Sequence, residues 1–507
     1  LKIAEGGRLV RQTARDRDAA EEMRSRRRSK ADDMVYDEQK RGNRQIFIIT
    51  YFFVALFLGM MVYITVFMVR DSADIINNSY NKRQEVLAKK VKRGKILSAD
   101  GKVLAKTITD KKGNDKRYYP YNNMFCHVIG RITNSMTGVE LSQCYPLLTS
   151  HANPLEQLTD NFKGKKKPGD NVVTTINYKL QKTAYDAIGS YRGAVVAMEP
   201  STGKILAMVS KPDYNPNTVG KDWDKLISGG DGNSALLNRA TQGIYPPGST
   251  FKILTAAEYI IENGSKYKNY KYVCKGTDEF YGNKISCYGG EVHGKVNLNR
   301  AFSESCNGAF ANIGLKLNTG SFKSLCEKFG FNRELSVNFE YKKSSFVLNG
   351  KSDKGEIMQT AIGQGKTGIT PLENVLISST IANKGKMMAP YVVDHTESDS
   401  GKQVKKYSPK SAGKIIDKSV AVSVKNLMKS AVKDGTASSL NRFSYRVAGK
   451  TGSAEFDSKG TSHAWFVGFA PADNPKIAVS IVVEGAGTGS RYAVPIAEKM
   501  FREYLGD

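Results

Sequence analysis

The most prominent hydrophobic pattern in the chain is one long apolar segment near its start. Residues 46–69, IFIITYFFVALFLGMMVYITVFMV, contain 24 residues and no charge. A helix of this length spans the hydrocarbon core of a bilayer, which needs roughly 20 apolar residues. A buried helix of a soluble protein would show a polar stripe, whereas only Thr and Tyr interrupt this segment. The pattern therefore predicts a single transmembrane helix over 46–69.

Charge on either side of this segment predicts its orientation. Basic residues crowd the side that precedes it: Arg24, Arg26, Arg27, Arg28, Lys30, Lys40, Arg41 and Arg44. Because cytoplasmic flanks are enriched in Lys and Arg, we expect residues 1–45 to form a basic cytoplasmic tail and the chain after residue 70 to lie outside. No small-residue cleavage site follows directly, so we expect an uncleaved anchor. The first 33 residues are strongly charged and are expected to be disordered.

The chain after the anchor begins with a short region of strands and turns. Residues 71–95 are charged and are expected to continue as a helical stalk. The segment RGKILSADGKVLAKT predicts two strands around an Asp100-Gly101 turn. Turn-forming residues then lead to KGKKKPGD, an exposed link. Residues 70–170 are therefore predicted to form a small N-terminal pedestal domain with its linker.

From residue 171 onward the pattern is that of a larger α+β domain, 171–507. A strand and a helix are predicted in NVVTTINYKLQKTAYDAI, and a hairpin in GAVVAMEPSTGKILAMVS. Helices are predicted at 301–317, at 419–433 and from Val494, and three strands lie in SYRVAGKTGSAEF, HAWFVGFAP and KIAVSIVVEG. Strands come early and late, which predicts a mixed antiparallel sheet, built from both ends of the domain, with helices packed on it. The polar segment 394–414 predicts a surface loop or hairpin.

One segment of this domain, GIYPPGSTFKILTAAEYIIENG, suggests nucleophilic chemistry. Pro246, Pro247 and Gly248 break regular structure directly before Ser249. A buried helix is predicted to follow and to end at Gly264, with Lys252 one turn after the serine on the same face. A lysine among apolar neighbours loses its proton readily, so the pair combines a nucleophile with its base. A capped core helix with a solvated lysine is the simpler interpretation, and this segment alone favours it.

Two further motifs have to be selected from several copies by their context. S-x-x-K also occurs at Ser79, Ser201 and Ser411, S-x-N at four places, and K-T-G at both Lys366 and Lys450. Ser305-Cys306-Asn307 lies among small residues that allow close packing at a cleft. Lys450-Thr451-Gly452, followed by Ser453, lies in a predicted strand. Lys366 instead lies in a loop that enters a helix, and is interpreted as structural support near the site.

With these three motifs in this order, the chain resembles the class B penicillin-binding proteins, the membrane-anchored serine D,D-transpeptidases of bacterial wall synthesis. Further likeness lies in RGKILSADGKVLA, LLNRATQGIYPPGSTFK and IGQGKTGITPLEN, and it covers most of residues 81–507. The brief N-terminal module is similar to that of the short-pedestal subgroup. The resemblance implies a penicillin-binding/serine β-lactamase-like transpeptidase domain, with an antiparallel sheet flanked by helices.

The resemblance also implies roles for the first two motifs. Ser249 would attack the peptide carbonyl between two D-alanines of a wall stem peptide, and Lys252 would take the hydroxyl proton. Ser305 would pass that proton to the leaving amine, while Asn307 would hold Lys252 and bind a substrate amide. A second stem peptide would then resolve the acyl-enzyme and form the cross-link. β-Lactams resemble D-Ala-D-Ala and would acylate Ser249.

The third motif would bind the substrate and stabilise the transition state. Lys450 would supply positive potential, Thr451 would bind the substrate carboxylate, and Gly452 would let the peptide lie against the strand. The backbone N–H groups of Ser249 and Ser453 would form the oxyanion hole, each worth about 3 kcal/mol. The family often has Thr where Ser453 stands, a difference of little consequence if the backbone N–H is what acts. His463 is a weak alternative base, since Lys252 already fills that role.

Cysteine and histidine positions predict disulfide chemistry rather than metal binding. Cys274 and Cys287 flank a predicted hairpin tip, where a disulfide is plausible. The five histidines are scattered without ligand spacing, so neither a metal site nor a cofactor is predicted. The other four cysteines are a candidate pair, Cys126 and Cys144, and two residues of predicted helices, Cys306 and Cys326.

The net charge of +27 indicates either an anionic partner or a solvated surface. No zinc-finger or RNP-like pattern supports nucleic acid, and wall polymers or lipid headgroups suit the outer domain better. The resemblance further implies a polytopic membrane glycan polymerase as partner. Three alternatives stay open: a β-lactamase or sensor, although E-x-x-L-N is absent from the sequence, a D,D-carboxypeptidase, and a non-enzymatic scaffold.

Overall fold

The computed structural model describes residues 3–70, 83–151, 166–228, 234–456 and 460–506, in two compact units, Leu1–Ile76 and Asn77–Asp507. The first unit consists of one helix, α1 (Ile3–Arg70). Its part from Arg17 to Phe67 is long and apolar enough to cross a membrane, and it is the only such helix in the described ranges. The disorder expected for the first 33 residues is wrong from residue 3 onward. Proline is absent there, and ion pairs such as Glu22 with Arg26 (2.8 Å) favour a helix.

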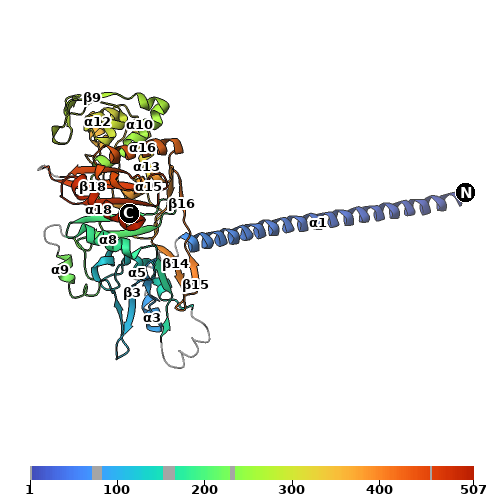
Figure 1. Ribbon diagram of the computed structural model, residues 1–507. Coiled ribbons are helices and arrows are strands. Elements are labelled where there is room, and N and C mark those ends of the chain that lie inside the picture. Colours follow the sequence, from blue (N-terminus) through green and yellow to red (C-terminus); the bar gives the residue numbers. More distant parts are fainter. Residues whose placement is uncertain (1–2, 71–82, 152–165, 229–233, 457–459, 507) are drawn as a thin grey trace. The chain divides into compact units, whose positions relative to one another are not determined.

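The second unit is built on a five-stranded antiparallel sheet (Figure 1). Its strand order β17-β18-β19-β7-β8 joins an early hairpin to three late strands, as the sequence predicted. The strands are β7 (Gly193–Met198), β8 (Ile205–Lys211), β17 (Ala448–Glu455), β18 (Ser462–Ala470) and β19 (Ile477–Val483). Strand β17 is therefore an edge of this sheet.

Both faces of the sheet are covered by helices, which explains why its strands are continuous apolar runs. Alternate side chains enter different cores: Val195 and Ala197 pack on one side, Ala194 and Val196 on the other. Helices α8 (Tyr178–Ile188) and α18 (Val494–Leu505) cover the first side, and α15 (Pro371–Ala382) the second (Figure 1). Helix α15 is buried along its whole length.

The remaining helices of this domain lie mainly above α15 and carry the candidate site (Figure 1). The predicted single helix over 301–317 is two helices in the structure, α11 (Leu298–Ser303) and α12 (Asn307–Gly314). The chain breaks between them because Ser305 adopts a left-handed conformation, φ 60°. The others are η3 (Gly248–Phe251), α10 (Lys252–Asn263), η4 (Gly264–Asn269), α13 (Thr319–Phe329), α14 (Lys354–Ala361), α16 (Lys418–Lys433), η6 (Ser438–Arg442), α9 (Trp223–Ile227) and α17 (Gly489–Tyr492).

Short strands between α10 and α11 form a separate small layer. Strands β10 (Thr277–Phe280) and β11 (Asn283–Ser286) form the predicted hairpin around Tyr281-Gly282-Asn283. Strand β9 (Tyr272–Cys274) pairs with β12 (Gly294–Val296), and η5 (Tyr288–Gly290) precedes β12.

The predicted pedestal region, residues 70–170, contributes strands to a six-stranded sheet of order β15-β14-β6-β2-β3-β4. The strands predicted around Asp100-Gly101 are present, and the segment 394–414 contributes a hairpin. The sheet thus takes strands from both sides of residue 170: β2 (Ile96–Leu97), β3 (Val103–Thr109), β4 (Asp115–Tyr118), β6 (Asn171–Thr174), β14 (Val393–Glu397) and β15 (Gln403–Lys406). The other elements of the predicted pedestal region are α3 (Arg83–Lys90), β1 (Val91–Lys92), η1 (Asn122–Phe125), α4 (Cys126–Ile129), α5 (Gly138–Ser142), α6 (Cys144–Leu147) and β5 (Lys167–Pro168). Strands β13 (Lys386–Met388) and β16 (Ser411–Lys414) form a separate pair near α16.

The expected helical stalk over 71–95 is present only in part. Residues 71–82 lie outside the described ranges, α3 covers 83–90, and a strand follows at Val91. Beneath the strands, buried Glu140 accepts hydrogen bonds from Arg93 Nε (2.7 Å) and Arg117 Nε (2.6 Å). This carboxylate therefore ties two segments of the pedestal together.

Candidate active site

Ser249 lies in a tight turn that is held from several sides. The Pro-Pro-Gly sequence leads into η3, where Gly248 has φ 55° and donates its N–H to Gly363 O at 2.8 Å. The indole of Trp465, on β18, donates to Pro246 O at 3.1 Å. Thr250 Oγ1 donates to Pro247 O at 2.8 Å. The serine is half-buried, at the start of the largely buried helix α10, as the sequence predicted.

The chain before this turn is fixed by a charged network. Tyr245 exchanges backbone hydrogen bonds with Ile369 (3.0 and 2.8 Å), and its hydroxyl donates to Glu484 Oε1 at 2.7 Å. The same carboxylate accepts from Arg239 Nε at 2.8 Å and from Arg192 Nε at 3.0 Å. The approach to Ser249 is therefore anchored both to the loop before α15 and to the end of β19.

Lys252 is fully buried and donates only to neutral oxygens in the part of the chain that the structure describes. Its Nζ lies 2.6 Å from Ser305 O, 3.2 Å from Ser305 Oγ and 2.7 Å from Asn307 Oδ1. Burial lowers the pKa of Lys252 to about 8, although the nearby thiols of Cys306 and Cys287 oppose the shift. The amine is thus available as a base near neutral pH. The Ser249 hydroxyl has no hydrogen-bond partner within the described ranges.

Ser305 and Asn307 reach Lys252 because the chain changes direction between α11 and α12. The left-handed Ser305 turns its carbonyl and hydroxyl towards the lysine, and Asn307 opens α12. The Asn307 amide spans two elements, since its Nδ2 also donates to Ser286 O of β11 at 2.8 Å. The break that separates the two helices therefore creates the acceptor set of Lys252.

The third motif, Lys450-Thr451-Gly452, lies on the edge strand β17. This strand contacts η3, the turn that contains Ser249. Lys450 is fully buried, and burial together with the charge of Lys252 lowers its pKa well below the usual range. Thr451 Oγ1 shares a 2.5 Å hydrogen bond with Thr436 Oγ1. At Gly452 a Cβ would lie 3.2 Å from the Thr250 and Trp465 side chains, so this glycine permits close packing of the strand against the turn.

All eight predicted site residues come together at one open cleft of about 810 Å³. Lys252 and Lys450 are buried beneath it. Its lining includes Ser249, Ser305, Asn307, Thr451, Gly452 and Ser453. Further lining residues that the sequence analysis did not single out include Glu304, Gln364 and Thr436.

Lys366 and His463 were the alternatives to Lys450 and Lys252 in the sequence analysis. Lys366 has a side chain that is 81% exposed, with Glu356 3.9 Å away, while its neighbour Gln364 lines the cleft. His463 is buried, stacks on Phe456 and accepts from Gly485 N at 3.2 Å. Its contacts are those of a structural histidine.

The cysteines differ from expectation. All six are free and buried, so the plausible Cys274–Cys287 disulfide and the candidate Cys126–Cys144 pair are absent from the structure. Cys274 Sγ and Cys287 Sγ lie 3.6 Å apart, well beyond the ~2.05 Å of a disulfide. Together with His293 and Cys306 they form a buried group whose ligand atoms all lie within 4.8 Å of one another. Sequence spacing did not reveal this group because its members come from separate turns.

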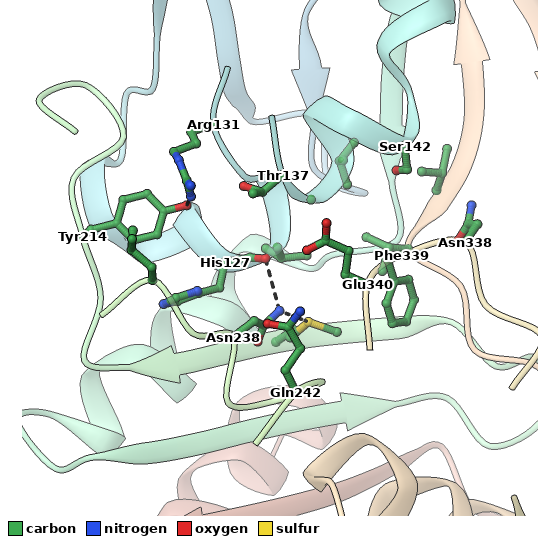
Figure 2. Close-up of a pocket in the computed structure, with 17 residues that line it drawn as sticks. His127, Arg131, Thr137, Ser142, Tyr214, Asn238, Gln242, Asn338, Phe339 and Glu340 are labelled. Atoms are coloured by element: carbon green, nitrogen blue, oxygen red, sulfur yellow. Dashed lines mark hydrogen bonds between the residues drawn. The ribbon is translucent and has the colours of Figure 1, made fainter. Parts of the chain in front are cut away.

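A second, smaller cavity lies where the pedestal meets the larger domain (Figure 2). Its volume is about 50 Å³, and two hydrogen bonds cross its lining: Asn238 Nδ2 donates to His127 O at 3.3 Å, and Arg131 Nη1 donates to Tyr214 OH at 3.1 Å (Figure 2). Burial lowers the pKa of His127 to about 4, so that imidazole is neutral. This cavity has the contacts of a packed junction between the two regions.

Comparison with known proteins agrees with this geometry. Residues 193–505 match the family profile "Penicillin binding protein transpeptidase domain". The peptidoglycan D,D-transpeptidase PbpA of Mycolicibacterium smegmatis is 34% identical over 432 residues, which cover 80% of this chain and 87% of that protein. PbpA of Mycobacterium tuberculosis is 32% identical, with 82% and 89% covered. The ceftriaxone acyl-enzyme complex of penicillin-binding protein A from M. tuberculosis gives a TM-score of 0.75 at 31% identity, covering 83% of this chain and 100% of that one.

The packing around the nucleophile turn predicts a specific cost for one glycine substitution. Gly363 has φ 84°, and a Cβ there would lie 1.9 Å from Gly248 O. Gly363→Ala should lower the melting temperature of the detergent-solubilised chain by several degrees, because overlap adds to the ~1–2 kcal/mol of a left-handed residue. Gly101→Ala is the control, since Gly101 has φ 77° and open space around its Cβ position. Equal melting temperatures for the two variants would contradict this packing.

Proposed function

The chain belongs to the penicillin-binding protein transpeptidase family, and from this premise we infer that it is a peptidoglycan D,D-transpeptidase working through a serine acyl-enzyme. It cross-links wall stem peptides and is inhibited by covalent β-lactam binding. The observation that best supports this function at the level of the site is the buried amine of Lys252, held by neutral oxygens beneath the cleft that Ser249 lines. No cofactor is needed for acyl transfer of this kind.

We propose the following roles for the reacting groups. The neutral Lys252 amine accepts the Ser249 hydroxyl proton as Oγ attacks the carbonyl carbon of the D-Ala-D-Ala peptide bond. Collapse of the tetrahedral intermediate breaks the C–N bond. The Ser305 hydroxyl, 3.2 Å from Lys252 Nζ, relays the proton to the leaving amine of the terminal D-alanine. An amine of a second stem peptide then attacks the ester, and Ser249 recovers its proton through the same path.

Substrate binding is proposed for the strand β17. We propose that Thr451, hydrogen-bonded to Thr436 at the cleft wall, binds the terminal carboxylate. Lys450 would supply positive potential once the bound carboxylate stabilises its charged form, which burial otherwise disfavours. The backbone N–H groups of Ser249 and Ser453 form the proposed oxyanion hole. Asn307, which already bridges Lys252 and β11, is the proposed contact for an amide of the stem peptide.

We also propose a topology and a partner. The apolar part of α1 spans the bacterial cell membrane once, with its basic flank in the cytoplasm and the catalytic domain outside. The polytopic glycan polymerase implied by the family resemblance would contact this span and the pedestal. The net charge of +27 suits contact with anionic wall polymers.

The assignment of the nucleophile is tested by covalent labelling. Fluorescent penicillin should label the full chain, and mass spectrometry should locate the adduct on the peptide that contains Ser249. Ser249→Ala should abolish the label because it removes the proposed nucleophile, and the Ser305 hydroxyl beside the same base is assigned to proton relay. Ser201→Ala, a change in an exposed S-x-x-K of the same chain, should leave labelling intact. An adduct on another residue would overturn the assignment.

The pKa of Lys252 predicts the pH dependence of acylation. Because the neutral amine is the base, the acylation rate should rise with pH through about 8 and level off above it. Lys252→Arg should reduce the rate on the order of 10²–10⁴-fold, since a guanidinium stays protonated. Stopped-flow labelling of the wild-type chain over this range provides the measurement. A rate that falls as pH rises through 8 would exclude Lys252 as the base.

A further inference from the structure

We propose that Cys274, Cys287, His293 and Cys306 bind one Zn²⁺ ion that fastens the small strand layer to the Ser305–Asn307 segment. The four side chains are buried, and each offers one ligand atom to the same point. They come from four places: the end of β9, the residue after β11, the residue before β12, and the cap of α12.

The distances between the ligand atoms fit a tetrahedral zinc centre. Sulfur lies 3.6 Å from sulfur for Cys274 and Cys287, and 3.9 Å for Cys287 and Cys306. Cys274 Sγ lies 3.4 Å from His293 Nδ1. With Zn–S near 2.3 Å and Zn–N near 2.0–2.1 Å, tetrahedral angles place sulfurs about 3.8 Å apart and sulfur and nitrogen about 3.5 Å apart. These separations are too long for a disulfide and match the edges of one coordination tetrahedron.

Hydrogen bonds around the group favour thiolates. Gly276 N donates to Cys274 Sγ and Ala309 N donates to Cys306 Sγ, each at 3.4 Å. Three thiolates and one imidazole are a ligand set of soft donors that selects zinc over magnesium or calcium, and four protein ligands make a closed structural site.

The small strand layer has too few buried apolar residues to be held in place by hydrophobic packing alone. Strands β9 to β12 have three or four residues each, against six to nine in the main sheet. The side chains of Val273, Tyr281, Tyr288 and Val292 in this layer are exposed. Its buried apolar residues are mainly Ile285, Val296 and the cysteines themselves. Small layers that lack an apolar core are commonly held by a metal ion or by disulfides.

The consequence for the cleft follows from the position of Cys306. This residue lies between Ser305 and Asn307, which supply the acceptors of Lys252. A bond from the metal to Cys306 would hold the left-handed turn at Ser305 and the start of α12 in place. Loss of the ion would therefore slow acylation of Ser249. This effect rests on the proposed function, whereas the proposal that the four side chains bind zinc does not.

The metal site can be tested on the full chain, solubilised in detergent and purified without a histidine tag. Mass-spectrometric metal analysis should find one zinc ion per chain, and cobalt substitution should give the visible spectrum of a tetrahedral thiolate site. Cys274→Ser and Cys287→Ser should lose the metal, while Cys326→Ser, a change at a buried cysteine of α13 outside the group, should retain it. Wild-type chain treated with a chelator provides the same comparison if a variant does not fold.

The readouts separate this proposal from the proposed function. Metal-free chain should be labelled by penicillin on the order of 10–100-fold more slowly, with the adduct still on Ser249. Displacement of the acceptors that hold Lys252 would slow acylation but would leave Ser249 as the nucleophile. Restored zinc should restore the rate. A chain without zinc that carries a Cys274–Cys287 disulfide would overturn the metal site, and an unchanged labelling rate after metal removal would overturn its coupling to the cleft. Zinc-loaded chain that is never labelled would instead contradict the proposed function.

Discussion

The desolvation of the Lys252 amine is the constraint on which the rest of the site depends. An ammonium in water is a poor base, and this one becomes usable because α10 lies in the core and only neutral oxygens face its nitrogen. An aspartate or glutamate at the same place would stabilise the charged form and remove the base. The packing of α10, the break between α11 and α12, and the amide of Asn307 all serve to keep the amine both buried and hydrogen-bonded.

A second requirement is that the serine turn and the edge strand stay at a fixed separation. The turn is held by the indole of Trp465 on β18 and by the Gly363 carbonyl, while Gly452 allows β17 to approach it closely. The main sheet thus contributes rigidity rather than reacting groups, with the exception of its free edge. That edge offers backbone donors at a cleft, which suits the binding of an extended peptide.

The sequence was a good guide wherever a pattern had one physical cause. Continuous apolar runs predicted strands β7, β8, β18 and β19 because both faces of the sheet are buried, and Pro-Pro-Gly before Ser249 marked the turn. Features set by tertiary contact were not predictable. The helix over 301–317 breaks at Ser305 although its residues all tolerate a helix, and Thr436 acquires its partner Thr451 only on folding. The group of Cys274, Cys287, His293 and Cys306 was not predicted for the same reason, because the sequence spacing of these residues matches no metal-binding motif.

Because Lys252 and Lys450 are both buried at one cleft, the protonation of one amine affects the protonation of the other. Lys252 and Lys450 each lower the stability of charge on the other, and no carboxylate among the described residues of the cleft bonds to either amine. With the carboxylate contact proposed at Thr451, an incoming anionic substrate would stabilise charge on Lys450. The charge on Lys450 then disfavours charge on Lys252, which is left neutral for Ser249. On the proposed roles, a substrate with a terminal carboxylate would therefore help to keep Lys252 in its basic form.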